Sequence, residues 1–554
     1  MKPSPIPGVT ENVYLALRRL RSNKRRPRTL WVDALSINQE DEAEKTAQVS
    51  EVGPIYADAK RVNVWLGYPT AAMGMFFEFL MVLLSYFFSS FSNSNATIPK
   101  GPRIYALTIP LTTQIPEYRD GFYQFCSAPS WARLWTIQEV ALNVDCWVYL
   151  GLAEPIEMSD LQGSLYRVAS DIERRWKLIR RTQDPRALHS AWRESRESRE
   201  PTAVMALHTF RGFSGLIQDV ENLYLLMTKK ASNPHDLVFA CRAQFPDTFG
   251  QIVVGYQRDP SDILREVTAH IISQTYSLGG LLGLVSLCPA VPGAPSWALK
   301  LYWDGPPRTT SYFHYFGLGS LRLPYAEYHL AARVLPDGET LSLRGFVVDH
   351  VALVSDPFPT YTLPYTRRWH NDVHTLLKGW RSVCASGGLK STFEEGLEYI
   401  LYAPANSMAI DDAKMSGSVD PKGTCLKYDD NLSKVRRSAL REWMNNPRTT
   451  PFYFDEGNLL SSPQSNDLMS TVRSPALSGS RLFITACGRM GLGRMVRRGD
   501  AIAIIAKCTL PIALRPVQGT GRYTLGQPSV LQGATFGEEW PVDNQTEFET
   551  IETV

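Results

Sequence analysis

Two carboxylates, Asp33 and Glu139, are the candidate catalytic groups of this sequence. The chain contains no Gly-x-Ser-x-Gly elbow, no His-Glu-x-x-His motif and no Walker motif, so the common serine hydrolases, zinc peptidases and P-loop nucleotide hydrolases are excluded. His370 and His374 are four residues apart on a predicted helix, but no carboxylate or cysteine completes a set of ligands nearby. We therefore predict surface histidines and no metal site, which leaves carboxylate chemistry.

Glu139 belongs to a dense group of aromatic and polar residues that includes Trp131, Arg133 and Trp135. The segment is predicted to form a short amphipathic helix followed by a strand over 144–150. Trp135 and Glu139 are four residues apart, so they share a face of this helix. A glutamate beside tryptophans can have a raised pKa or orient a sugar hydroxyl. The same residues can also form a buried structural pair, and the pattern alone leaves both interpretations open.

Asp33 is predicted to end the first strand of a strand–helix–strand unit. Apolar runs at 30–32 and 62–66 flank a segment whose apolar residues recur at helical spacing. A unit of this length implies parallel strands with a right-handed crossover. Chemistry in open parallel sheets collects at the carboxyl ends of the strands. Asp33 and the polar loop 36–39 are predicted to lie at such an end.

The stretch 76–91, FFEFLMVLLSYFFSSF, is very apolar and is predicted to be helical. It carries Glu78, and its charge-free part is shorter than the roughly 20 residues needed to span a bilayer. We favour a buried helix or a partner-binding face over membrane contact.

The overall composition indicates a globular intracellular protein. The chain has 554 residues, of which 44% are hydrophobic and 20% charged, and this length predicts three or four domains. A net charge of +3 is too small to indicate a nucleic-acid partner. The eight cysteines form no Cys-x-x-Cys pair, and the N-terminus has no apolar core of a secretory signal. We therefore expect reduced, mostly buried thiols and a cytoplasmic location.

The middle of the chain is predicted to be mostly helical. A strand is expected at 252–256, and Ser261 is expected to cap the helix that follows it. Residues 340–350 are predicted to form two strands around Gly345, and residues 367–415 are predicted to be helical again.

The C-terminal residues 481–540 alternate apolar strands with glycines, which indicates a small antiparallel barrel or sandwich. Turns are predicted at Gly488, Gly491, Gly493 and Gly499. A phosphate loop is disfavoured because the Gly-Arg-Met-Gly-Leu-Gly segment is not followed by Lys-Ser or Lys-Thr.

Several segments resemble the heterokaryon-incompatibility (HET) domain of filamentous fungi. In the N-terminal part they are LWVDALSINQ, the Glu-x-x-x-Gln-Val register from Glu44 to Val49, IYADAKRVNVWLG and WARLWTIQEVA. NPHDLVFA, Pro295–Trp297 and the glycine-rich tail ending in Gly537–Glu538 extend the resemblance.

The resemblance implies a three-part α/β organisation. Residues 1–155 would form a HET domain with a TIR/flavodoxin-like parallel sheet and flanking helices. Residues 156–330 would form a mostly helical HET-associated region. Residues 331–554 would form an α+β region that ends in the small barrel or sandwich.

The resemblance also implies a role in fungal non-self recognition and programmed cell death. HET domains are similar to Toll/interleukin-receptor (TIR) domains, some of which hydrolyse NAD with a glutamate four residues after a tryptophan. Trp135 and Glu139 match that spacing. Glu139 is therefore implied as the catalytic residue and NAD as a substrate, with no resident cofactor. The implied substrate-binding residues are Asp33, Ser36, Asn38, Gln39, Trp131, Arg133 and Trp135.

Two non-enzymatic alternatives remain open at this point. One is an interaction module that acts through protein partners or self-association, with 76–91 as the contact. The other is an inactive, truncated paralogue. The family usually begins with a strand and a loop carrying Ser-Tyr-x-Trp-Gly, whereas this chain begins at the following helix. We therefore expect an N-terminally incomplete domain that lacks its first strand, in which Ser36 replaces a common cysteine.

Overall fold

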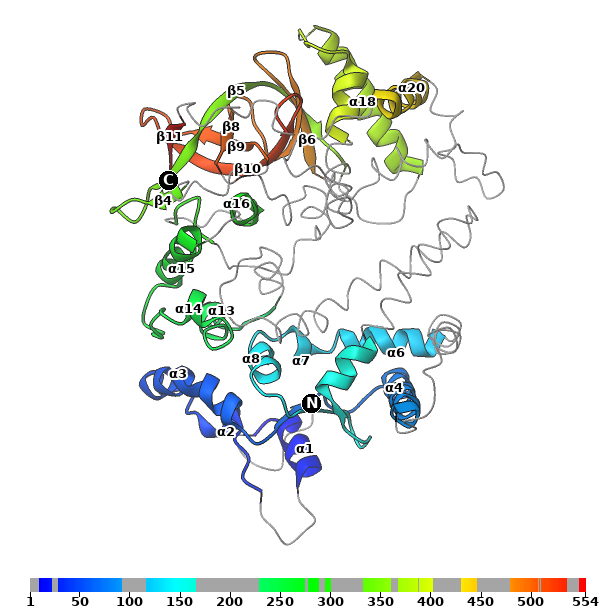
Figure 1. Cartoon of the computed structure of the whole chain (residues 1–554), viewed down its shortest axis with the longest axis vertical. Coiled ribbons are helices and arrows are strands. Elements are labelled where there is room, and N and C mark those ends of the chain that lie inside the picture. The colour runs from blue at the N-terminus through cyan, green and yellow to red at the C-terminus, as the bar shows by residue number, and fades with distance from the viewer. Residues whose placement is uncertain are drawn as a thin grey trace. The chain divides into compact units, whose positions relative to one another are not determined.

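The computed structural model describes most of the chain in two compact units, which are treated separately here (Figure 1). The first unit comprises Met1–Ile217 and Asn222–Ile263, and the second comprises Gln218–Glu221 and Leu264–Val554. The described residues are 9–21, 28–91, 116–165, 229–274, 278–287, 294–299, 332–359, 367–386, 388–401, 430–445, 479–506, 508, 510–535 and 548–554.

The first unit combines helices with a small sheet. Its helices are α1 (Glu11–Leu20), α2 (Asp33–Ser36), α3 (Glu42–Asp58), α4 (Ala71–Phe91), α6 (Pro116–Cys126), α7 (Pro129–Ala132), α8 (Thr136–Ala141), α13 (Asp236–Phe239) and α14 (Pro246–Phe249). Its strands are β1 (Val62–Trp65), β2 (Cys146–Tyr149) and β3 (Ile156–Glu157).

Among the described strands of the first unit, one pair is parallel and one pair is antiparallel. β1 and β2 run parallel with Val62 opposite Cys146, and β3 joins β2 antiparallel. The predicted parallel α/β sheet is thus confirmed in part. The TIR/flavodoxin-like topology stays a prediction.

The predicted strand over 30–32 is wrong, because the chain turns into α2 directly after Trp31. The Val32 carbonyl accepts from the N–H groups of Leu35 and Ser36, and the Ser36 hydroxyl lies 3.4 Å from the Val32 N–H. Leu30 is 38% exposed, while Trp31 packs edge-on against Tyr56 of α3 at 5.7 Å between ring centroids. These local hydrogen bonds satisfy the backbone without a neighbouring strand.

Helix α3 matches its prediction and is fixed at its start by a side-chain cap. The Asp41 carboxylate accepts from the N–H groups of Ala43 and Glu44, each at 3.0 Å. Val49 and Val52 form the buried face. Gly53 lies so close to the segment after α13 that a Cβ placed on it would stand 2.4 Å from the Ala243 Cβ.

Helix α4 is buried against α6, as the predicted buried helix requires (Figure 1). Phe76 lies fully buried, 5.5 Å from Phe122 and 5.9 Å from Phe125 between ring centroids, while Glu78 faces outward. Among the described residues, no helix is both long and apolar enough to cross a membrane.

The helix after the predicted 252–256 strand is α15 (Pro260–Gln274), which continues into the second unit. Its first-turn cap is Asp259, whose carboxylate accepts from the Ser261 N–H at 2.7 Å, so the prediction of Ser261 as the cap is wrong. The strand at 252–256 is also wrong. Ile252 is buried but Val253 is 68% exposed, and this stretch is a loop.

The second unit is built around an antiparallel sheet, with helices α16 (Leu278–Leu287), α18 (Arg367–Ser386) and α20 (Asp430–Asn445). Its strands are β4 (Ala332–Val334), β5 (Leu341–Pro357), β6 (Ser480–Thr485), β7 (Met490–Arg494), β8 (Ala501–Ile505), β9 (Ile512–Pro516), β10 (Tyr523–Leu531) and β11 (Glu549–Thr553). Pairing runs from β5 through β6, β7, β10, β9 and β8 back to β5, which closes a barrel (Figure 1).

Of the predicted barrel or sandwich, the structure shows a barrel. The split of 340–350 into two strands and the turns predicted at Gly491 and Gly493, which both lie within β7, are wrong. Residues 340–350 belong to the single long strand β5, in which Gly345 pairs with Ile505 and Glu549. Gly491 lies inside β7, where the Phe483 ring covers it so closely that a Cβ would stand 2.1 Å from the ring. Gly488 does form a turn, with φ of 78°.

The remaining sequence predictions have mixed outcomes. The six described cysteines form no disulfide with one another, and all but Cys487 are buried. His374 is half-buried rather than at the surface, with its Nε2 3.1 Å from the Met444 carbonyl. Within the described part of the chain, no group of His, Cys, Asp and Glu side chains is arranged to hold a metal ion. The predictions for 166–228 and 402–429 lie outside the described residues.

Candidate functional site

Four side chains of the first unit form the strongest chemical group, called here the Glu139 cluster: Asp33, Tyr56, Arg133 and Glu139. The Arg133 guanidinium lies 3.7 Å from the Asp33 carboxylate, and both side chains are about half exposed. Glu139 interacts electrostatically with both of them, and Tyr56 with all three. The structure therefore brings together three of the predicted site residues and adds Tyr56, which the sequence did not indicate.

The four residues come from three different elements. Asp33 begins α2, Tyr56 lies near the end of α3, and Arg133 and Glu139 flank the start of α8. Helix α8 contacts α3, α7 and β1. The Asn143 amide donates to the Tyr56 carbonyl at 2.9 Å and so holds the end of α3 beside the segment that follows α8.

Burial dominates the electrostatics of the cluster. Glu139 keeps partial solvent exposure as a residue, but protein surrounds its carboxyl, and this burial raises the pKa of Glu139. The Arg133 guanidinium opposes the shift by favouring the carboxylate, and the Asp33 charge adds to it. Burial also raises the pKa of Tyr56, so its phenol stays protonated and is available as a hydrogen-bond donor. A carboxyl with a raised pKa beside a phenol and a guanidinium has the components of an acid–base site.

The two tryptophans of the segment lie in different environments. Trp131 is fully buried, and its indole N–H donates to the Phe125 carbonyl at 2.9 Å. It therefore supports the segment from within the core. Trp135 precedes α8 and is partly exposed. Gln138 is buried, and its amide N–H lies 3.3 Å from the Phe239 carbonyl. Its Oε1 has no hydrogen-bond partner among the described residues.

The loop 36–39 is held by hydrogen bonds between side chains and backbone N–H groups. The Asn38 side-chain oxygen accepts from the Glu40 N–H at 3.1 Å, and the Asn38 N–H donates to the Glu44 carboxylate at 3.0 Å. Gln39 is exposed. The predicted position of this loop at a strand end is not observed, because 30–32 form no strand.

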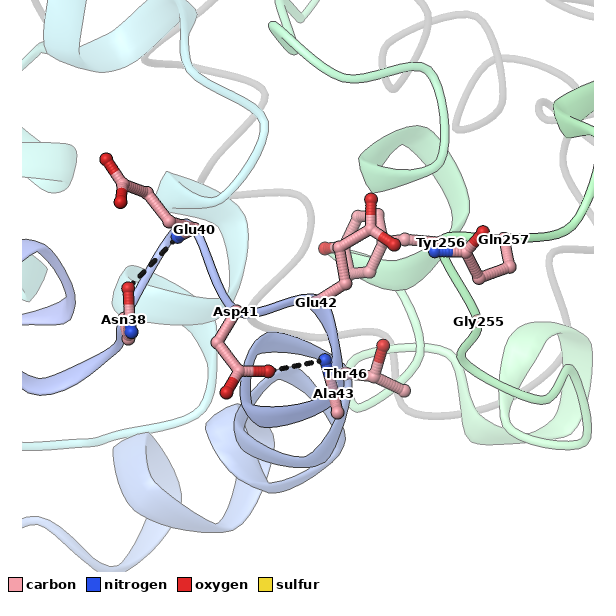
Figure 2. A pocket seen from close by; sticks show the side chains of 9 residues that line it. All are labelled: Asn38, Glu40, Asp41, Glu42, Ala43, Thr46, Gly255, Tyr256 and Gln257. Atoms are coloured by element: carbon pink, nitrogen blue, oxygen red, sulfur yellow. Dashed lines mark hydrogen bonds between the residues drawn. The ribbon is translucent and has the colours of Figure 1, made fainter.

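Asn38 also lines an open pocket of about 900 Å³ between the start of α3 and the loop before α15 (Figure 2). The remaining lining residues are Glu40, Asp41, Glu42, Ala43, Thr46, Gly255, Tyr256 and Gln257. Figure 2 shows these residues as sticks, with Glu42 on α3 and Tyr256 on the segment that precedes α15. Its three acidic residues give it a negative character, which suits polar or cationic groups rather than phosphates.

Tyr256 is the aromatic anchor of this pocket and was missed from the sequence. Its hydroxyl donates to Asp236 at 2.7 Å, and Lys45 lies over its ring at 4.1 Å from the centroid. His235 and Phe239 pack against the same ring. The Asn-Pro-His-Asp element that resembles the family pattern thus binds α3 to the rest of the unit. Its signal was present in the sequence, but its partner Tyr256 was hidden in the wrongly predicted strand.

This geometry defines an α/β domain in which helices around a parallel strand pair assemble a buried glutamate, an arginine, an aspartate and a tyrosine. The family comparison identifies the domain. Residues 4–139 match the family model described as Heterokaryon incompatibility protein (HET). The chain therefore carries a HET domain over these residues, which include Asp33, Tyr56, Arg133 and Glu139. No curated protein and no solved structure matches the chain.

Proposed function

We propose that this HET-domain protein acts in fungal non-self recognition and cell death by cleaving NAD at the Glu139 cluster. The HET match supports the role in heterokaryon incompatibility. The observation that supports a reaction is the raised pKa of Glu139 beside Arg133 and Asp33. A carboxyl with a raised pKa holds a proton more readily than an ordinary glutamate, which suits a group that exchanges protons during a reaction.

In the proposed reaction, the bond between ribose C1 and the nicotinamide nitrogen breaks and its electron pair leaves with nicotinamide. The ribose passes through an oxocarbenium-like state, as in glycoside cleavage. The Glu139 carboxylate accepts a hydrogen bond from a ribose hydroxyl and takes the proton of the water that attacks C1. The products are ADP-ribose, nicotinamide and a proton. Arg133 favours the ionised form of Glu139 that this step requires.

The start of α4 serves as core of the unit. Phe76, Phe77, Phe79 and Leu80 are buried, and Phe76 and Phe79 pack on aromatic side chains of α6. An interaction surface on α4 would therefore have to use residues beyond Leu80, where Val82 is 65% exposed. A polar substitution at Leu80 would therefore test folding rather than assembly.

The test is nicotinamide release from NAD by the purified full-length chain. Glu139→Gln removes the carboxylate and is expected to abolish release. Glu51→Gln is the matched control, because Glu51 is an exposed glutamate of α3 outside the cluster. Wild-type protein that releases no nicotinamide contradicts NAD cleavage. Equal release by wild-type and Glu139→Gln protein contradicts the role of Glu139.

A further inference from the structure

Lys229 is a buried lysine that contacts the segment carrying Arg133. Its residue is 4% exposed, and its amine donates to the Trp131 carbonyl at 2.7 Å. Burial lowers the pKa of Lys229 to about 7, so the amine is largely neutral in mildly alkaline solution. Burying an amine is unfavourable unless it is hydrogen-bonded, and the Trp131 carbonyl provides that bond. Nothing in the sequence pattern indicated that Lys229 would be buried.

The backbone of the next residue, Lys230, binds the same segment. Lys230 forms an isolated parallel bridge with Arg133. Its N–H donates to the Ala132 carbonyl at 2.6 Å, and its carbonyl accepts from the Leu134 N–H at 2.9 Å. Residues 229–230 thus bind the peptide groups of 131, 132 and 134. Arg133 lies between these contacts, so its backbone position is fixed.

Helix α7 is too short to fix Arg133 by itself. It comprises only Pro129–Ala132, and a helix of one turn leaves its last carbonyls without intrahelical partners. The Arg133–Asp33 ion pair is half exposed and contributes little holding force. The buried contact from Lys229 is the better-shielded restraint on this segment.

We propose that Lys229 is a positioning residue that holds Arg133 against Asp33 and Glu139 by anchoring the Trp131 carbonyl. Its effect on turnover rests on the proposed NAD cleavage, whereas its effect on Arg133 does not. Without the amine, the 131–134 segment shifts and Arg133 no longer favours the ionised form of Glu139. A displacement of about 1 Å in such a group costs ~10²-fold in rate.

The experiment compares Lys229→Met with Lys230→Met in the full-length chain. Lys230 is exposed and acts through its backbone, so its substitution keeps the bridge. The first readout is kcat and KM for NAD. The second is an infrared titration of the Glu139 carboxyl, identified by subtraction of the Glu139→Gln spectrum. Lys229→Met is expected to lower kcat by ~10²-fold and to raise the pKa of Glu139, while Lys230→Met changes neither.

A double-mutant cycle shows whether Lys229 acts through Arg133. Arg133→Gln alone is expected to raise the pKa of Glu139, and adding Lys229→Met is expected to cause no further rise. An unchanged Glu139 titration in Lys229→Met overturns the proposal, as does a further rise in the double variant. If Lys229→Met does not fold, Lys229→Leu, which also lacks a donor, is used with the same criteria. Wild-type protein without NAD turnover refutes the proposed function alone, because the titration still decides the position of Arg133.

Discussion

Replacing Gly121 of α6 by alanine is expected to push α4 and α6 apart. The added Cβ would stand 2.1 Å from the Ala72 carbonyl oxygen and 2.7 Å from the Phe76 Cβ. Carbon atoms in contact prefer separations of about 3.5–4.0 Å, so the helices must separate by about 1 Å. Overpacking of this kind costs about 1–3 kcal/mol or more, and the opened gap weakens the contacts of Phe76 with Phe122. The gain in helix propensity offsets about 1 kcal/mol.

The expected net loss is up to about 2 kcal/mol in the free energy of unfolding of the first unit. At about 2–4 °C per kcal/mol, its melting temperature falls by up to about 8 °C. Differential scanning calorimetry of the full-length chain measures this. Gly74→Ala in α4 is the matched control, because its Cβ would meet only Pro69 at 3.7 Å. We expect Gly74→Ala to raise stability by about 0.5–1 kcal/mol. If both variants raise the melting temperature, the close approach of α4 and α6 at Gly121 is refuted.

Three further substitutions have defined outcomes. Burial raises the pKa of Glu139 in the folded state. The stability that the protonated Glu139 contributes is therefore fully present below the unfolded-state pKa and is lost as the pH rises through the folded-state pKa. Glu139→Gln protein should thus resist urea better than wild type in alkaline buffer and equally in acid; a constant difference would contradict this. Asp500→Asn breaks the ion pair between Arg515 and Asp500, whose side chain is only 4% exposed, and should lower the free energy of unfolding by about 3–5 kcal/mol in guanidinium titrations. An unchanged free energy of unfolding would show that the ion pair does not stabilise the unit. Gly491→Ala forces a methyl group into the Phe483 ring and should cost about 1–3 kcal/mol, and an unchanged thermal midpoint would show that the strand relaxes freely.

The helices that were predicted correctly are those whose sequence pattern lies within one continuous segment. Helix α3 carries its cap and its apolar spacing in one continuous segment, and α4 was recognised from its apolar run. The strand at 30–32 failed because three apolar residues do not reveal whether a neighbouring strand exists. Gly491 was taken for a turn because glycine spacing does not show which side chain covers the backbone.

The candidate cluster was predictable where its residues are close in sequence. Arg133 and Glu139 lie six residues apart in one segment, and the structure brings them together; the role of Trp135 stays a prediction. Tyr56 could not be found, because it reaches the cluster through the packing of α3 on α8. Lys229 contacts Trp131 from 98 residues away, and no spacing rule connects the two.

The pairing of the last strand with β5 constrains the order in which the second unit can be completed during synthesis. Strand β11 pairs with β5, and the Thr553 hydroxyl reaches the Leu341 carbonyl across 212 residues. The ribosome therefore delivers β5 long before its partner exists. The first unit, complete by about residue 263, is able to fold while the barrel strands are still being made. In the interval the apolar face of β5 is exposed, and long-range pairing of this kind is slow and open to aggregation.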